Sequence, residues 1–144
     1  MKTVKIKKLT DTAIIPTKGS AKAAGYDLYS DETIGIEPGT CVKISTGLAI
    51  TPPKGYFGAV FARSGLASKQ GLRPANCVGV CDEDYTGEYM VALYNDSSET
   101  QMIQKGERIA QLVFLPYINV DFEEVEELEK TDRGAGGFGS TGTK

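Results

Sequence analysis

Residues 76–88 read Asn-Cys-Val-Gly-Val-Cys-Asp-Glu-Asp-Tyr-Thr-Gly-Glu, a pattern that predicts a strand, a turn and a second strand. Small and apolar residues run up to Asp82, and a fresh apolar run covers residues 89–94. We expect Gly87 to supply the positive φ that hairpin loops need. Asp82 stands where the apolar run stops, so rigid backbone would hold its carboxylate at the hairpin rim, a suitable place for a general base. The same residues also fit an ordinary turn rich in Asp and Gly.

Short apolar runs separated by turn residues predict further strands on both sides of this stretch. They cover residues 4–6, 26–29, 33–36, 41–50, 56–61, 100–103 and 107–113. A spacing of roughly ten residues favours an all-β sandwich or barrel over alternating strands and helices. One short helix is expected directly after Arg63. Residues 122–128 have apolar positions at three-residue intervals, as in a helical turn, but the all-β context favours an edge strand.

The composition is that of a globular protein. The chain has 144 residues, of which 40% are hydrophobic and 24% charged, and this length fits one domain. No apolar run approaches membrane-spanning length, so we expect no membrane partner. A net charge of −3 gives no general attraction for a phosphate backbone, which disfavours nucleic-acid binding. The first residues include no apolar segment of a signal peptide, and we expect a cytoplasmic protein.

The sequence contains no histidine, which limits the chemistry that it can perform. Ser-His-Asp and Cys-His catalysis are excluded, as are zinc sites that use imidazole. Acid-base chemistry must therefore fall to Asp, Glu, Tyr, Lys or Cys. Cys41, Cys77 and Cys81 form no Cys-x-x-Cys pair, which supports neither a disulfide framework nor a thiolate metal site. We expect Cys77 and Cys81 to be small buried apolar residues.

Two further segments have features of ligand binding. Arg63-Ser64-Gly65 directly follows a predicted strand and combines a guanidinium, a hydroxyl and free N–H groups, which suits a phosphate. Residues 130–144 are rich in glycine and cannot hold themselves in one shape. A frayed terminus is the ordinary interpretation of such a tail. However, Phe138 between glycines, with Arg133 before it and Ser140-Thr141 after it, suits a segment that closes over a flat anionic ligand.

Five segments together resemble, in order, the five motifs of the trimeric dUTP diphosphatases (dUTPases). They are Ala24-Gly25-Tyr26-Asp27-Leu28, Arg63-Ser64-Gly65-Leu66-Ala67, residues 76–88, Gly106-Glu107-Arg108-Ile109-Ala110-Gln111-Leu112 and residues 133–142. The resemblance implies a jelly-roll-like β-barrel domain over residues 1–129 and a flexible tail over residues 130–144 that closes over an active site. It also implies a homotrimer in which three subunits contribute to each active site.

The reaction implied by the resemblance is hydrolysis of dUTP to dUMP and pyrophosphate, with Mg²⁺ bound by the triphosphate. This would limit uracil incorporation into DNA and supply dUMP for dTMP synthesis. By position, Asp82 would activate the water that attacks the α-phosphorus, and Asp27 would support the metal through water. The phosphates would be bound by Arg63, Ser64, Gly65 and Gln111. Asn76 and hairpin backbone including Gly79 would contact uracil, and Tyr85 would lie under the deoxyribose. The tail would contribute Arg133, Phe138, Gly139, Ser140 and Thr141.

The chain departs from the family pattern at three positions. Ala62 stands where many relatives have Pro, Cys81 where an aliphatic residue is usual, and Ala135 where Ser is common. Two alternatives remain open: a nucleotide-gated regulatory protein of the same fold, and dCTP deamination on the related fold. The intact Asp82 favours catalysis over regulation alone. The glycine-rich tail and the Asp-x-Asp-Tyr hairpin favour the diphosphatase.

Overall fold

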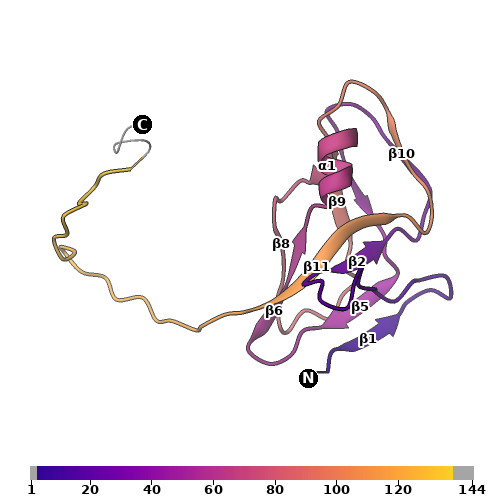
Figure 1. Ribbon diagram of the computed structural model, residues 1–144. Helices are drawn as coiled ribbons and strands as arrows, with labels where there is room; N and C mark the ends of the chain where they lie inside the picture. The colour runs from indigo at the N-terminus through magenta and orange to yellow at the C-terminus, as the bar shows by residue number, and fades with distance from the viewer. Residues whose placement is uncertain (1–2, 138–144) are drawn as a thin grey trace.

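The computed structural model describes residues 3–137 and shows a body of short strands with one short helix (Figure 1). The all-β prediction is confirmed. In chain order the elements are β1 (Lys5–Lys8), β2 (Tyr26–Tyr29), β3 (Ile34–Ile36), β4 (Cys41–Ile44), β5 (Leu48–Thr51), β6 (Tyr56–Phe61), α1 (Ser64–Gln70), β7 (Leu72–Pro74), β8 (Gly79–Cys81), β9 (Val91–Asn95), β10 (Gln101–Ile103) and β11 (Arg108–Pro116).

The strands pair antiparallel in four small sheets. The orders are β2-β11-β6-β8, β4-β9-β7, β1-β5 and β10-β3. The long strand β11 lies between β2 and β6, so Gln111 is opposite Asp27 on one side and Phe61 on the other. This register brings three segments that are far apart in the sequence to one place, because α1 begins shortly after β6.

Alternation of apolar and polar residues explains how the strands form the core. In β9, Val91 and Leu93 are buried while Ala92 and Tyr94 between them are half-buried, which is the period-two pattern of a strand. Asn95 is buried at the end of β9, and its side-chain amide donates to the carbonyls of Ile36 and Glu99. A buried amide paired in this way is tolerated in the core.

The central stretch differs from its prediction in sheet pairing and in the role of its glycine. β8 pairs with β6 and β9 pairs with β4 and β7, so the two strands belong to different sheets and form no hairpin ladder. Gly87 is not among the residues with positive φ, whereas Cys77 has φ 51°. Cys77 is exposed, not buried as expected, and Cys81 is half-buried.

Three other expectations need correction. The strand predicted over residues 41–50 is divided into β4 and β5, because Gly47 adopts φ 65° and ends the extended run. Residues 122–128 form neither the preferred edge strand nor a helical turn, and they are exposed. β7, which ends in Pro74, was not predicted from its short run.

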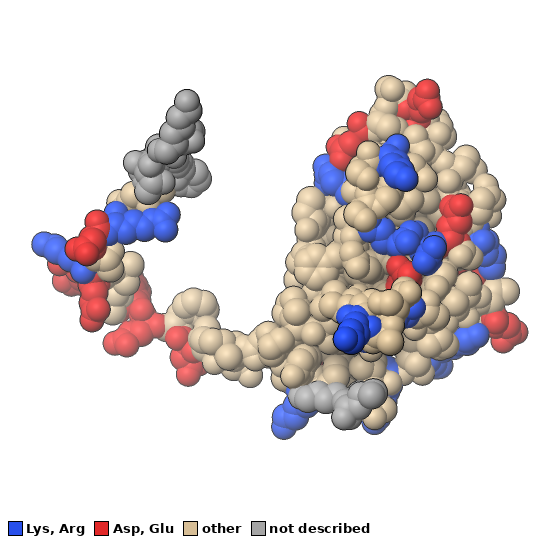
Figure 2. All heavy atoms as spheres, in the orientation of Figure 1, with Lys and Arg blue, Asp and Glu red and all other residues tan. Residues whose placement is uncertain are grey.

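Beyond β11 the chain leaves the body as an extended arm, residues 117–137, drawn in orange to yellow in Figure 1. Acidic side chains gather along this arm, while many lysines and arginines lie on the visible face of the body (Figure 2). Within residues 3–137, no helix is long and apolar enough to cross a membrane.

Candidate active site

One pocket, here called the arginine pocket, collects residues from the first, second and fourth motifs. It has a volume of about 360 Å³. Its lining residues are Gly19, Ala23, Ala24, Gly25, Asp27, Arg63, Ser64, Gly65, Arg108 and Gln111. All five residues that the sequence analysis assigned to phosphates or metal near these motifs are therefore brought together. The cause is the pairing of β2, β11 and β6 in one sheet.

Asp27 organises the charges of the arginine pocket. Its Oδ1 accepts a hydrogen bond from Arg63 Nε at 2.9 Å, and its Oδ2 accepts one from Arg108 Nη1 at 3.3 Å. The Asp27 side chain is only 13% exposed, so one largely buried carboxylate orients two guanidinium groups. Arg63 also donates from Nη1 to the carbonyl of Arg108. Arg108 was given no role in the sequence analysis, because a regular strand would turn a residue three positions before Gln111 to the opposite face. A register shift between Arg108 and Ala110 interrupts this alternation, and both side chains, those of Arg108 and Gln111, line the pocket.

Gly25 is required by the position of Gln111. Gln111 Nε2 donates to the carbonyl of Ala62 at 2.8 Å, which fixes the amide across the end of β6. A Cβ added to Gly25 would lie 2.6 Å from Gln111 Oε1 and 3.3 Å from Gln111 Cβ. The glycine at position 25 therefore lets the Gln111 amide lie against the backbone of the first motif.

A second pocket, here called the hairpin pocket, contains Asp82 and has a volume of about 350 Å³. Asp82 directly follows β8 and is exposed at its rim, as predicted. The pocket is lined by Lys43, Val60, Asn76, Gly79, Val80, Cys81, Asp82, Tyr85, Glu88, Tyr89, Met90, Val91 and Ala92. It thus holds the residues of the central stretch that were assigned to the base, the sugar and the attacking water.

Two glycines let polar side chains lie close to the backbone of the hairpin pocket. A Cβ on Gly79 would lie 3.2 Å from Asn76 Nδ2 and 3.1 Å from Val60 Cβ. A Cβ on Gly87 would lie 2.5 Å from the Tyr85 hydroxyl oxygen, so this glycine serves close approach and not a positive φ. The Tyr85 hydroxyl donates to the carbonyl of Glu88 at 3.0 Å.

Behind Asp82 the hairpin pocket is lined by partly or fully buried groups, and hydrogen bonds of Glu88 hold its loop in place. Burial raises the pKa of the Cys81 thiol and the pKa of the Tyr89 hydroxyl, so both groups stay neutral near pH 7. The Glu88 carboxylate accepts from the Ser45 hydroxyl at 2.5 Å and from the Gly47 amide at 2.8 Å. Glu88 was not identified from the sequence, and it ties the loop after β8 to the turn between β4 and β5.

The two pockets of one chain are separate, since no residue lines both. Arg133 lies in the exposed arm, where its Nε donates to the carbonyl of Gly136 at 2.9 Å, and it belongs to neither pocket. Phe138, Gly139, Ser140 and Thr141 lie outside the described residues.

Comparison with known proteins gives the family. The dUTPase family model matches residues 11–142, nearly the whole chain. The chain belongs to the dUTPase family. The deoxyuridine 5'-triphosphate nucleotidohydrolase of Desulfitobacterium hafniense is 53% identical over 131 residues, which cover 89% of this chain and 87% of that protein. The prediction of a dUTP diphosphatase is therefore confirmed at the level of the family.

Solved dUTPases show the same fold. The dUTPase of Staphylococcus bacteriophage 80alpha with dUpNHpp has a TM-score of 0.87 and 32% identity, with 99% of each chain covered. A mutant dUTPase of phage phi11 of S. aureus, described with a structural Mg(II) ion, has a TM-score of 0.82 and 28% identity, with 90% of this chain and 100% of that chain covered. The jelly-roll-like fold expected of this dUTPase chain is thereby confirmed.

The described side chains of this dUTPase chain do not form a metal-binding site of their own. Among residues 3–137 no group of three or more His, Cys, Asp or Glu side chains could hold a metal ion. Both oxygens of Asp27 accept hydrogen bonds from arginines. A magnesium ion bound here would therefore have to take its ligands mainly from a substrate and from water, and not from these side chains.

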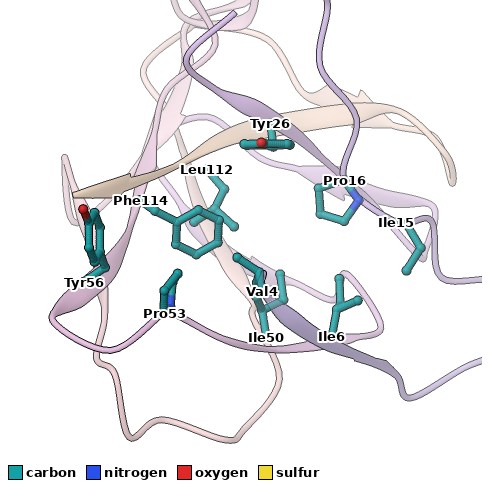
Figure 3. A pocket seen from close by; sticks show the side chains of 10 residues that line it. All are labelled: Val4, Ile6, Ile15, Pro16, Tyr26, Ile50, Pro53, Tyr56, Leu112 and Phe114. Atoms are coloured by element: carbon teal, nitrogen blue, oxygen red, sulfur yellow. The ribbon is translucent and has the colours of Figure 1, made fainter. Parts of the chain in front are cut away.

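A third pocket, of about 320 Å³, contains none of the predicted site residues. Figure 3 shows the rings of Tyr26, Tyr56 and Phe114 on one side of the pocket and the aliphatic side chains of Ile6 in β1 and Ile50 in β5 below them. Its lining contains no charged side chain, so we do not place the triphosphate site of this dUTPase chain there.

Proposed function

We propose that this chain hydrolyses dUTP to dUMP and pyrophosphate, with Asp82 as the general base. The observation that carries the proposal is the position of Asp82. In a chain without histidine, its exposed carboxylate lies at the end of β8, at the rim of the pocket formed with Asn76 and Tyr85. A carboxylate in such a place can accept a proton from an ordered water.

The proposed reaction is an in-line displacement at the α-phosphorus. Asp82 accepts a proton as the water oxygen bonds to phosphorus, and the bond from phosphorus to the bridging α,β-oxygen breaks. Pyrophosphate leaves with that oxygen, and dUMP keeps the oxygen of the water. Catalysis of this kind consists mainly of positioning and charge stabilisation.

The arginine pocket supplies the positioning of the phosphates. Arg63, Ser64, Gly65 and Gln111 line it together, and Asp27 holds the guanidinium of Arg63 in place before substrate binds. A preoriented guanidinium can bind phosphate oxygens with two hydrogen bonds. We assign Arg108 to the same task, because Asp27 orients its guanidinium as well.

The hairpin pocket supplies selection of the nucleoside. The Asn76 amide has both donors and acceptors, which suits the polar edge of uracil. The ring of Tyr85 would lie under the deoxyribose and exclude a 2′-hydroxyl. A pocket built around a specific polar edge rejects bases that leave its groups unpaired.

The separation of the two pockets supports a shared active site. Phosphate and nucleoside contacts lie in different pockets of one chain, so a complete site would combine pockets of neighbouring copies in a homotrimer. The tail with Arg133, Phe138, Gly139, Ser140 and Thr141 would close this site. Magnesium would offset part of the charge of the triphosphate, with Asp27 as a supporting carboxylate. The enzyme would act in the cytoplasm, limit uracil in DNA and supply dUMP for dTMP synthesis.

The direct test is the variant Asp82→Asn, which keeps the size of the side chain and removes its basicity. We expect turnover of dUTP to fall by about 10²–10⁴-fold, the usual contribution of a general base, while dUTP binding persists. Asp84→Asn is the matched control, since it removes a charge from the same loop. Near-normal turnover in Asp82→Asn would remove Asp82 from the role of base.

A further inference from the structure

Three segments of the chain meet at the side chain of Glu83, the residue after Asp82. Glu83 Oε2 accepts a hydrogen bond from the Gly55 amide at 2.6 Å and another from the Tyr117 hydroxyl at 2.8 Å. The Tyr117 amide donates in turn to the carbonyl of Gly55 at 3.2 Å. The turn between β5 and β6, the loop after β8 and the first residue after β11 therefore form one closed junction.

This junction matters because the Asp82 side chain itself is held by little else. Within residues 3–137, its carboxylate makes no hydrogen bond or ion pair. Its backbone is fixed on one side by Cys81, which is opposite Gly58 in the β6–β8 pairing. On the other side the Asp82 carbonyl accepts a hydrogen bond from the Tyr85 amide at 3.2 Å within the same turn, and the first contact of this loop with another segment is the Glu83 side chain.

We propose that Glu83 is a positioning residue for Asp82, and that the hydroxyl of Tyr117 and the amide of Gly55 hold it in place. The root of the C-terminal arm thereby sets the direction in which the carboxylate of Asp82 points. The inference rests on the proposed role of Asp82 as general base and adds the groups that orient this base.

The protonation states of the partners fit this arrangement. The hydrogen bond from Gly55 lowers the pKa of Glu83, and the hydroxyl of Tyr117 lowers it further. The hydrogen bond to Glu83 raises the pKa of Tyr117. Near pH 7 an ionised carboxylate therefore faces a neutral phenol, the combination in which the hydroxyl donates.

The contacts of Glu83 allow the effect of its hydrogen bonds to be tested separately from the effect of its negative charge. A single oxygen, Oε2, accepts both bonds, and the carbonyl oxygen of glutamine has two lone pairs for the same purpose. Glu83→Gln therefore removes the negative charge near Asp82 and keeps the junction. Glu83→Ala removes both, and Tyr117→Phe removes one hydrogen bond and leaves the charge.

The experiment is steady-state hydrolysis of dUTP by the full chain with magnesium, with kcat and KM measured separately. We expect Glu83→Ala and Tyr117→Phe to lower kcat by roughly three- to tenfold, less than the ~100-fold cost of a 1 Å misplacement, with KM within about twofold. Glu83→Gln should keep kcat within about twofold of the unchanged chain. Glu37→Ala, which removes a carboxylate bound to the Thr100 hydroxyl elsewhere, is the matched control and should do the same.

The double variant Glu83→Ala with Tyr117→Phe should be no slower than Glu83→Ala alone, because both changes break one interaction. A kcat of Glu83→Gln as low as that of Glu83→Ala would show that charge acts, and would overturn the proposal. An unchanged kcat in Tyr117→Phe, which removes only one oxygen atom, would overturn it as well. Activity of Asp82→Asn is a separate readout, so failure of the base assignment is distinguishable from failure of the junction.

Discussion

The contact between Gly25 and Gln111 allows a prediction with a defined size. The change Gly25→Ala places a methyl group 2.6 Å from Gln111 Oε1 and 3.3 Å from Gln111 Cβ. The amide must move, which distorts its hydrogen bond to the carbonyl of Ala62. Because the nearest atom is the movable end of a half-buried side chain, the loss of folding free energy should lie at or below the lower end of the about 1–3 kcal/mol that overpacking of a core costs. For a chain of this size, each kcal/mol corresponds to roughly 2–4 °C in Tm.

The displaced amide should also weaken phosphate binding. A hydrogen bond to a charged group is worth about 1.5–3 kcal/mol, so kcat/KM for dUTP should fall by roughly 10- to 100-fold. Gly19→Ala is the matched control, because a Cβ at Gly19 meets no atom within 4 Å. Thermal unfolding and initial-rate assays of both variants measure the two effects. Full kcat/KM and Tm in Gly25→Ala would refute the argument that Gln111 and Gly25 form one unit.

Three further outcomes are expected. Deletion of residues 133–144 should leave a folded protein with severely reduced dUTP hydrolysis, because residues 133–137 place no side chain in the core and the tail is proposed to close the active site; aggregation on gel filtration would show a structural role instead. Hydrogen bonds from Thr10 and Thr12 lower the pKa of Asp31 below 3.8, so its stabilisation is present above that pH and is lost as pH falls through the lowered value. Urea unfolding of Asp31→Asn should show a loss of about 1–3 kcal/mol at pH 7 that shrinks as the pH falls below 3.8. Since burial raises the pKa of Cys81, iodoacetamide at pH 8 should alkylate the exposed Cys41 and Cys77 before Cys81, as mass spectrometry of tryptic peptides can show.

Local patterns were sufficient to predict most elements. The alternation in residues 26–29 and the run of residues 56–61 after a turn predicted β2 and β6 with the bounds that the structure has. The helix after Arg63 was also expected, and α1 ends at Gly71, which adopts φ 67°. These features depend on near neighbours in the sequence, so a single sequence contains the information.

Pairing partners could not be predicted in the same way. The two strands that flank the loop at Asp82 looked like one hairpin, yet each has its partners in a different sheet. Sheet order depends on contacts between distant segments, which an alternating pattern does not specify. For the same reason, the ion pairs of Asp27 with Arg63 and Arg108 were visible only in the folded chain.

The residues assigned to the phosphates and those assigned to the nucleoside line two separate pockets. No pattern in the sequence indicates the distance between these pockets. The resemblance to the family implied sharing between subunits, and the structure adds that one chain forms two distinct pockets. The arm at residues 122–128 illustrates the remaining difficulty. Its apolar residues are exposed. Packing against the core therefore stabilises neither a helix nor a strand in this segment.

The most direct test of the proposed function is pyrophosphate release by the purified chain with magnesium. The substrates dUTP, dCTP, dTTP and UTP should be compared at equal concentration. The account predicts rapid release from dUTP and little from the other three, because Asn76 and Tyr85 select the base and the sugar. Absence of release from dUTP, or equal release from dCTP, would contradict the account.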